Sequence, residues 1–315
     1  MPSSIKQSSS TTKSKSSPKS KSSPKSKSSP KYTSPTPLKS ISSTITFDNI
    51  QDDVLQIIFK SLTIKQLLHI YKTNKTFSDK KLVFEMEVVD LSNLTIDMQT
   101  INFLDKVLDK SKIKKLILNN TKFVIKTPEI FSGNTKIFEN VKELQIKNTI
   151  INVKVNYFLK KYLNLEDIKS LKIRRLILDN ISFAGDEAYE DFNYNIEYYQ
   201  NLEELIINNF NTIEGRGYDV EGINYFNEFI EQIRVLGNLK KLRINHTDII
   251  AETESDENRV FVDVFLETLG ELVNLQYLKF YKNNIYKEQL DEIEEGIKDR
   301  FTKRKNVWLI RKVRV

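Results

Sequence analysis

The side chains that most often carry out enzyme chemistry are scarce in this sequence. It contains no cysteine and only two histidines, His69 and His246. A cysteine nucleophile, a disulfide framework and a cysteine–histidine zinc site are therefore excluded within one chain. His246 stands two residues before Asp248, but no serine occurs in a recognisable nucleophile motif, and a triad needs all three groups. We interpret His246 as a surface residue and expect no enzyme activity, no cofactor and no metal site.

Three other polar stretches are also explained without chemistry. Glu187, Glu190 and Asp191 fit the exposed face of a helix better than the carboxylate pair of a glycosidase. The glycines of residues 214–217, EGRG, permit a tight turn, but the stretch lacks the spacing and the lysine of a phosphate-binding loop. The acidic residues of 251–258, AETESDEN, are expected in a solvated loop.

Charge divides the chain into a basic tail and a nearly neutral remainder. Residues 1–40 hold nine lysines and no acidic residue, and subtracting nine from the net charge of +7 leaves −2 for residues 41–315. KSKSSP occurs three times in residues 13–30, and this composition offers nothing to bury, so residues 1–44 are predicted to be a disordered tail. Ser17, Ser23 and Ser29 each precede proline and are candidate phosphorylation sites. Alternatively, the tail lysines could contact nucleic-acid phosphates.

Hydropathy gives an expectation about the compartment. No apolar run reaches the roughly 18 residues that a membrane helix needs. The first ten residues, MPSSIKQSSS, contain no hydrophobic signal core. Together with the absence of cysteine, this predicts an intracellular, reducing location in the cytoplasm or nucleus and no membrane partner.

Residues 45–82 are predicted to form three short helices. Asp52 and Asp53 suit a helix N-terminus, and the apolar residues that follow recur at intervals of three and four. Thr63 can cap a second helix, and a third is expected over residues 74–81 with Phe77 facing inward. Such a small helical unit has a thin core and is expected to lean on a partner or on the next domain.

This helical segment resembles an F-box. The matching residues are Ile50, Asp53, Val54, Leu55, Ile58, Phe59, Leu62, Leu67 and Leu68, and Phe77 stands where the family has tryptophan. Gln51 replaces the usual proline, and Thr73 and Asn74 replace valine and cysteine. The resemblance implies that a Skp1-like adaptor of a cullin-based ubiquitin ligase binds Ile50, Val54, Leu55, Ile58, Phe59, Leu62, Leu67 and Leu68. The alternative is that these helices only cap the repeats that follow.

From residue 86 onward one pattern recurs, of which IKKLILNNTKF is the clearest copy. Seven copies begin, at intervals of 27 to 37 residues, at Met86, Ile113, Val141, Ile173, Leu202, Leu239 and Leu275. Positions 4 and 6 of each copy are apolar and two apart, which predicts a strand with one buried face. A last strand is expected from Val307, and helices are predicted over residues 97–110, 220–236, 259–272 and 287–301.

The pattern resembles the leucine-rich repeat over residues 83–315. The resemblance implies an α/β solenoid in which parallel strands line a concave face and helices cover the convex side. The family's asparagine at position 9 is kept only as Asn283, so we expect the side-chain ladder under the turn to be degraded.

Positions 3, 5 and 7 of each copy should point outward on the concave face. Position 5 is apolar in three copies, at Ile117, Ile177 and Ile206. Exposed apolar patches usually mark a surface that binds a partner or ligand. Toward the C-terminus the face becomes basic and aromatic, through Arg243, Tyr277, Lys279 and Tyr281. We expect these seven residues to bind a partner protein, with an acidic or phosphorylated segment at the C-terminal end. The alternative is that the isoleucines reflect strand propensity alone.

Together these patterns predict a non-catalytic substrate-recognition subunit of a ubiquitin ligase that pairs a Skp1-like adaptor with an unknown target protein. One alternative is a repeat scaffold without a ubiquitin role. A second is a nucleic-acid-associated factor that acts through the basic tail.

Overall fold

The structure is a computed structural model, and it describes residues 50–74, 77, 79–125, 136–165, 167, 171–213, 225–247, 257–283, 285, 287–301 and 308–312. Contacts divide the chain into two units, Met1–Thr44 and Ile45–Val315, and all described residues belong to the second. The predicted phosphorylation sites Ser17, Ser23 and Ser29 therefore lie outside the described residues.

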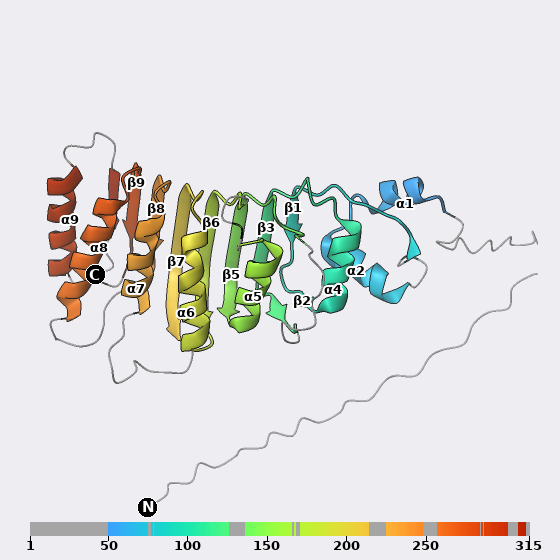
Figure 1. Ribbon diagram of the computed structural model, residues 1–315, viewed down its shortest axis with the longest axis horizontal. Helices are drawn as coiled ribbons and strands as arrows, with labels where there is room; N and C mark the ends of the chain where they lie inside the picture. Colours follow the sequence, from blue (N-terminus) through green and yellow to red (C-terminus); the bar gives the residue numbers. More distant parts are fainter. Residues whose placement is uncertain are drawn as a thin grey trace, which may run out of the picture. The chain divides into compact units, whose positions relative to one another are not determined.

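Eight parallel strands form one sheet, whose spatial order follows the order of the chain (Figure 1). The strands are β1 (Val88–Asp90), β3 (Lys115–Asn119), β5 (Glu143–Ile151), β6 (Arg175–Phe183), β7 (Glu204–Ile213), β8 (Lys241–Asn245), β9 (Tyr277–Tyr281) and β10 (Trp308–Lys312). Each contains the core of one predicted repeat, and β10 corresponds to the strand expected from Val307. Two short strands, β2 (Thr95–Ile96) and β4 (Lys122–Phe123), pair separately. The α/β class with a parallel sheet is thus confirmed, in a solenoid-like arrangement.

The strands pair copy to copy, each repeat position against the same position of the next repeat. One row at position 4 runs through six fully buried leucines: Leu116, Leu144, Leu176, Leu205, Leu242 and Leu278. Identical apolar side chains stacked at strand spacing bury the inner face of the sheet continuously. The register shifts between Ile181 and Phe183, where β6 pairs with β7.

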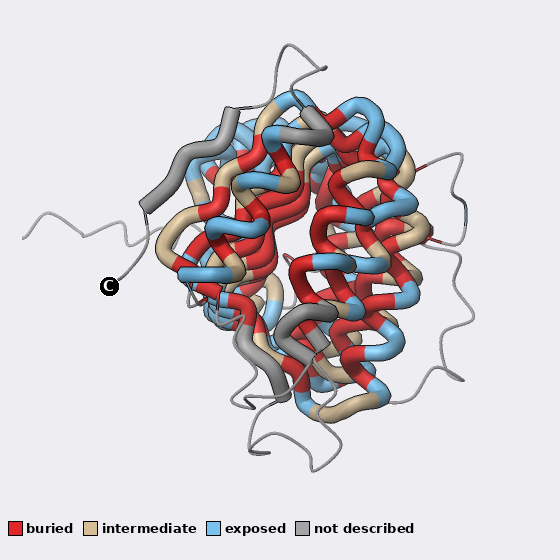
Figure 2. The backbone as a smooth tube through the Cα atoms, turned by 90° about the vertical axis from the view of Figure 1, so that its left-hand side faces the viewer, coloured by how far each residue is buried: buried red, intermediate tan, exposed pale blue. Residues whose placement is uncertain are grey.

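Helices cover one face of this sheet (Figure 1). They are α4 (Met98–Val107), α5 (Val153–Tyr162), α6 (Asp186–Tyr194), α7 (Tyr225–Gln232), α8 (Glu257–Glu271) and α9 (Lys287–Phe301), with 3₁₀ turns η3 (Asn195–Tyr198) and η4 (Ile233–Val235). The buried residues lie where the strands and the helices face each other (Figure 2). The helix predicted over residues 287–301 is confirmed with the same bounds, and those over 97–110 and 259–272 are confirmed with shifted ends. The helix predicted over 220–236 is confirmed over Tyr225–Gln232, and residues 220–224 lie outside the described residues. Helix α5 was not predicted, although Val155, Phe158, Leu159 and Tyr162 have helix spacing and are buried.

The N-terminal helices share the core of the repeats. They are α1 (Asp52–Phe59) and α2 (Ile64–Thr73), and the predicted cap of α2 is present as a capping box between Thr63 and Gln66. Phe77 is buried, with its ring centroid 5.2 Å from that of Phe59. The expected third helix lies partly outside the described residues. One continuous apolar cluster runs from α1 to α9, so these helices are integrated with the sheet domain.

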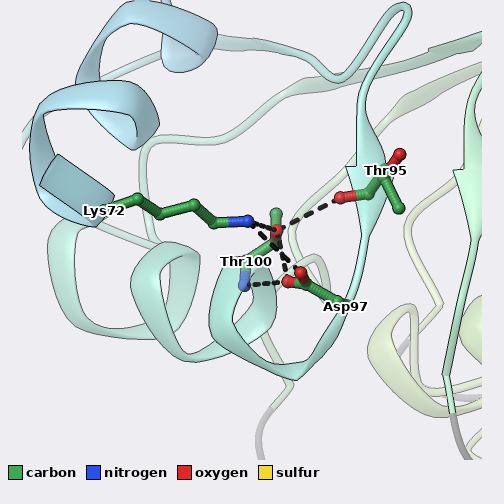
Figure 3. A network of polar contacts seen from close by, with 4 residues as sticks. All are labelled: Lys72, Thr95, Asp97 and Thr100. Carbon is green, nitrogen blue, oxygen red and sulfur yellow. Dashed lines mark hydrogen bonds and ion pairs between the residues drawn. The ribbon is translucent and has the colours of Figure 1, made fainter.

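A polar network fastens α2 to the first repeat (Figure 3). Asp97 caps α4, where its Oδ1 accepts from the Thr100 backbone N–H and hydroxyl, both at 2.7 Å. Its Oδ2 lies 3.2 Å from Lys72 Nζ in α2. Burial raises the pKa of Asp97, but the hydrogen bonds from Thr100 and Lys72 and the Lys72 charge outweigh it, so the pKa lies below its usual value.

Asparagines at position 8, rather than position 9, form the exposed ladder at the strand ends. The seven position-8 residues all have left-handed φ between 44° and 57°: Asn93, Asn120, Asn148, Asn180, Asn209, His246 and Lys282. Asparagine tolerates this conformation, and Asn120, Asn180 and Asn209 each donate to the position-8 asparagine of the preceding copy. Position 9 is buried in every copy. Position 9 is therefore a separate, buried row in which Asn283 bonds to the preceding copy, and the exposed ladder at position 8 was not predicted.

Candidate functional site

The first candidate surface is the outer face of α1. Leu55 and Phe59 point into the core, whereas Val54, Ile57 and Ile58 are 42%, 74% and 50% exposed. These three side chains have the i, i+3, i+4 spacing that places them on one side of the helix. Because apolar side chains gathered on one exposed face usually mark a contact site, this face is a candidate docking surface.

The structure separates the eight predicted adaptor-binding residues into two groups. Ile50, Val54, Ile58 and Leu62 are exposed or half-buried. Four others are buried in the core of this chain: Leu55, Phe59, Leu67 and Leu68. Sequence reasoning missed Ile57, the most exposed of the apolar residues on α1, because it fills no position of the family pattern. Its spacing from Val54 and Ile58 is the signal that could have identified it.

A groove of about 440 Å³ separates the start of α2 from the first strand. One wall is the α1–α2 turn and the first residues of α2, Leu62 to Lys65. The other is the outward row of the first repeat, from Met86 to Ser92. The groove therefore joins the N-terminal helices to the face of the sheet opposite the described helices α4 to α9, which we call the open face (Figure 1).

The open face carries positions 3, 5 and 7 of each repeat, as predicted, but its isoleucines are not an exposed patch. Ile177 and Ile206 are only 7% and 8% exposed, and Ile117 is half-buried. Gln145 occupies the same row and is also buried. Close strand spacing lets the longer charged side chains at position 3 flank and shield this row. The expectation of an exposed apolar surface there is therefore wrong, and binding by these residues stays a prediction.

An alternating ladder of ion pairs crosses the open face. Glu143 Oε1 lies 2.9 Å from Lys115 Nζ, and Glu143 Oε2 lies 3.2 Å from Arg175 Nη1. Glu204 lies between Arg175, at 2.9 Å, and Arg243, at 3.0 Å. Burial raises the pKa of Glu143, but hydrogen bonds from Lys115 and Gln145 and the two neighbouring cations lower it below its usual value. The ladder begins and ends on a cation.

Beyond Arg243 the ladder meets aromatic rings instead of carboxylates. The Arg243 guanidinium lies over the Tyr277 ring, 5.3 Å from its centroid. Lys279 and Lys282 lie 4.7 Å and 5.3 Å from the centroid of Tyr281. Four of the seven predicted partner-binding residues, Arg243, Tyr277, Lys279 and Tyr281, are thus brought together on β8 and β9, and we call them with Lys241, His246 and Lys282 the basic–aromatic cluster. Ile117, Ile177 and Ile206 lie on β3, β6 and β7.

The described residues offer few groups suited to catalysis. They contain no set of three or more histidine, aspartate and glutamate residues placed to hold a metal ion. Burial, with smaller effects from Tyr157 and Asp105, raises the pKa of Tyr162 to about 12, and burial raises the pKa of Tyr199. Both phenols therefore remain neutral core groups at physiological pH. Within the described ranges, no helix has both the length and the apolar composition needed to cross a membrane.

The remaining predicted features are only partly described. His246 is exposed, but its neighbour Asp248 lies outside the described residues, as do residues 214–217 and 251–256. Glu187, Glu190 and Asp191 lie on α6 and are exposed, as predicted.

No protein-family model matches this sequence, and the comparison with curated proteins finds no match.

Proposed function

We propose that this protein is a non-catalytic substrate-recognition subunit of a Skp1–cullin–F-box ubiquitin ligase, built from an F-box-like helical segment and a leucine-rich-repeat solenoid. The exposed apolar face of α1 carries this proposal. Val54 and Ile58 belong to the residues that match the F-box pattern, and both remain open to a partner in this chain. An adaptor that covered them would bury apolar surface worth about 25 cal/mol per Å².

The mechanism is tethering. The α1 face holds the adaptor, and the open face of the sheet holds the target protein. The shared core and the Lys72–Asp97 contact hold α1 and α2 against the first repeats. A target bound on the open face is thereby kept at high effective concentration near the ligase, while the chemistry takes place on other subunits.

Co-expression with a Skp1-like adaptor tests the proposal. A variant carrying Val54→Asp and Ile58→Asp places two charges on the exposed face without emptying the core, and it should lose capture of the adaptor. Leu67→Asp is unsuitable, because Leu67 is fully buried and the variant would unfold.

A matched control uses exposed valines elsewhere on the chain. Val235→Asp with Val273→Asp adds the same charge at sites far along the sequence from α1 and should keep capture. Thermal unfolding of both double variants would verify that each is folded. If the full chain fails to bind the adaptor, or if both double variants bind equally well, the ligase role is refuted.

A repeat scaffold whose first helices only cap the solenoid is the second candidate function. The burial of Leu55, Phe59, Leu67 and Leu68 within this chain favours it, because capping alone explains why these residues are apolar. Under this alternative, the two aspartate substitutions on α1 leave every interaction of the protein unchanged.

A further inference from the structure

The basic–aromatic cluster differs from the rest of the open face in its charge balance. From Lys115 to Arg243, each carboxylate of the ladder lies between two cations. Residues 241–247 and 277–283 contain no acidic residue. Lys241, Lys279 and Lys282 form no ion pair with any described carboxylate. Lysines held against tyrosine rings keep their charge, since a ring attracts a cation without neutralising it.

The backbone supplies a second, independent observation. Position 8 is left-handed in all seven copies, and the first five copies use asparagine there. The last two use His246 and Lys282, with φ of 53° each. Histidine adopts left-handed backbone more readily than most residues, whereas lysine does so less often, so Lys282 is the less common choice at this position. Both side chains contact the ring of Tyr281. The centroid of the His246 ring lies 5.6 Å from the Tyr281 centroid, and Lys282 Nζ lies 5.3 Å from it.

We propose that the basic–aromatic cluster binds an extended acidic segment of the partner protein, one rich in aspartate and glutamate. This proposal rests on the proposed function of the open face as a partner-binding surface. Lys241 pairs in register with Tyr277, five residues before Lys282. At about 3.3 Å per residue, the cations therefore extend over roughly 16 Å along the strands. That length matches about five residues of an extended peptide.

The arrangement favours carboxylates along a chain over a single phosphate. Phosphate recognition usually relies on the forked donors of arginine converging on one group. The cluster's only arginine, Arg243, already pairs with Glu204. The remaining donors are lysines spread over two strands, which act as separate point charges. Both tyrosine rings already have cations over them, so a stacked nucleic-acid base would have to displace those cations.

Fluorescence anisotropy with the full chain tests the assignment. The probe is a labelled peptide in which glutamate alternates with serine, and its match carries glutamine instead of glutamate. Two competitors are a peptide with one phosphoserine and a single-stranded oligonucleotide. We expect binding of the glutamate peptide alone, weakening as salt rises because exposed charges are screened.

Charge-removing variants locate the site. The Lys279→Gln, Lys282→Gln variant should bind the glutamate peptide with about tenfold lower affinity, a loss of about 1.4 kcal/mol in binding free energy. Lys122→Gln with Lys154→Gln removes the same charge from exposed positions on β4 and α5 and should change affinity less than twofold. If the double variant unfolds, the single variant Lys279→Gln can replace it in the binding assay, because it leaves the left-handed residue Lys282 unchanged.

Several results would overturn the proposal. Equal binding of the glutamine peptide would remove the charge argument. A glutamate-peptide affinity unchanged in the Lys279/Lys282 variant would place the probe outside the basic–aromatic cluster. Tighter binding of the phosphoserine peptide or the oligonucleotide would assign the cluster to that ligand instead. Failure here is separable from failure of the ligase role, because the Val54/Ile58 variant should lose the adaptor yet still bind the glutamate peptide.

Discussion

Replacing Glu204 with glutamine should destabilise the protein while strengthening its binding of acidic peptides. The Glu204 carboxylate lies between Arg175 and Arg243, and its side chain is 16% exposed. Glutamine keeps the shape but leaves the Arg243 guanidinium without its counter-charge and Arg175 with Glu143 as its remaining carboxylate partner. Exposed ion pairs contribute about 0.2–1 kcal/mol each, whereas breaking a buried pair costs about 3–5 kcal/mol. These contacts lie between the two limits, so the expected loss is about 2 kcal/mol.

The neighbouring residue gives a matched control. Glu203 also has two cationic partners, Arg174 at 3.7 Å and Lys240 at 3.2 Å, but its side chain is 38% exposed. Glu203→Gln should therefore cost only about 0.5 kcal/mol. Urea denaturation measures both losses as shifts of the midpoint at constant slope.

The second readout is affinity. In the Glu204→Gln protein, the Arg243 charge is available to pair with a carboxylate of the ligand. The glutamate peptide should therefore bind about threefold more tightly, which corresponds to the free energy of one additional exposed ion pair. A Glu204→Gln protein as stable as the parent, or a Glu203→Gln protein equally destabilised, would refute the role given to burial. An unchanged affinity would refute the electrostatic continuity between the ladder and the cluster.

Four further predictions concern stability. Asp97→Ala should cost about 1.5 kcal/mol, because it removes a helix cap and an ion pair. The lowered pKa values of Asp97 and Glu143 mean that their contribution is fully present above their usual pKa values, 3.8 and 4.5, and is lost as the pH falls through the lower folded values. An Asp97→Asn, Glu143→Gln variant should therefore lose less stability than the parent on acidification in this range, and an identical pH profile would contradict this. Ile177→Ala should cost about 2–3 kcal/mol in urea denaturation, as expected of a buried residue, and a loss under 0.5 kcal/mol would contradict its burial. Asn180→Ala should cost about 1–2 kcal/mol, since it strains left-handed backbone and breaks the ladder, and Asn180→Gly should recover part of that loss.

Much of the fold could be predicted from the sequence because the signal is repeated. Each copy on its own is a weak indication of a strand, but seven copies at similar spacing require neighbours that bury the same face. The strands at Leu116, Leu144 and Leu176 pair position to position, as that reasoning requires. Helix α5 was not predicted, although its buried apolar residues have helix spacing. The exposed ladder at position 8 was not predicted, because the resembled family keeps its asparagine at position 9.

The candidate sites were predicted less well, because burial depends on neighbours that are remote in the sequence. Strand alternation correctly placed Ile177 and Ile206 on the open face, but it could not show that both are buried there. Helix spacing grouped Val54, Leu55 and Phe59, but only packing against the first repeats decided which remain exposed.

The sequence by itself determined the parallel α/β architecture, the lack of cysteine chemistry and the separation of a basic tail from a nearly neutral remainder. These follow from composition and period, which are properties of the chain read in order. Only the tertiary structure decided that the charges of the open face form an alternating ladder and that this ladder ends at Arg243, whose guanidinium lies over the ring of Tyr277. Ion pairs between residues about 30 positions apart exist only once the strands are in register, because electrostatic contacts depend on distance in space.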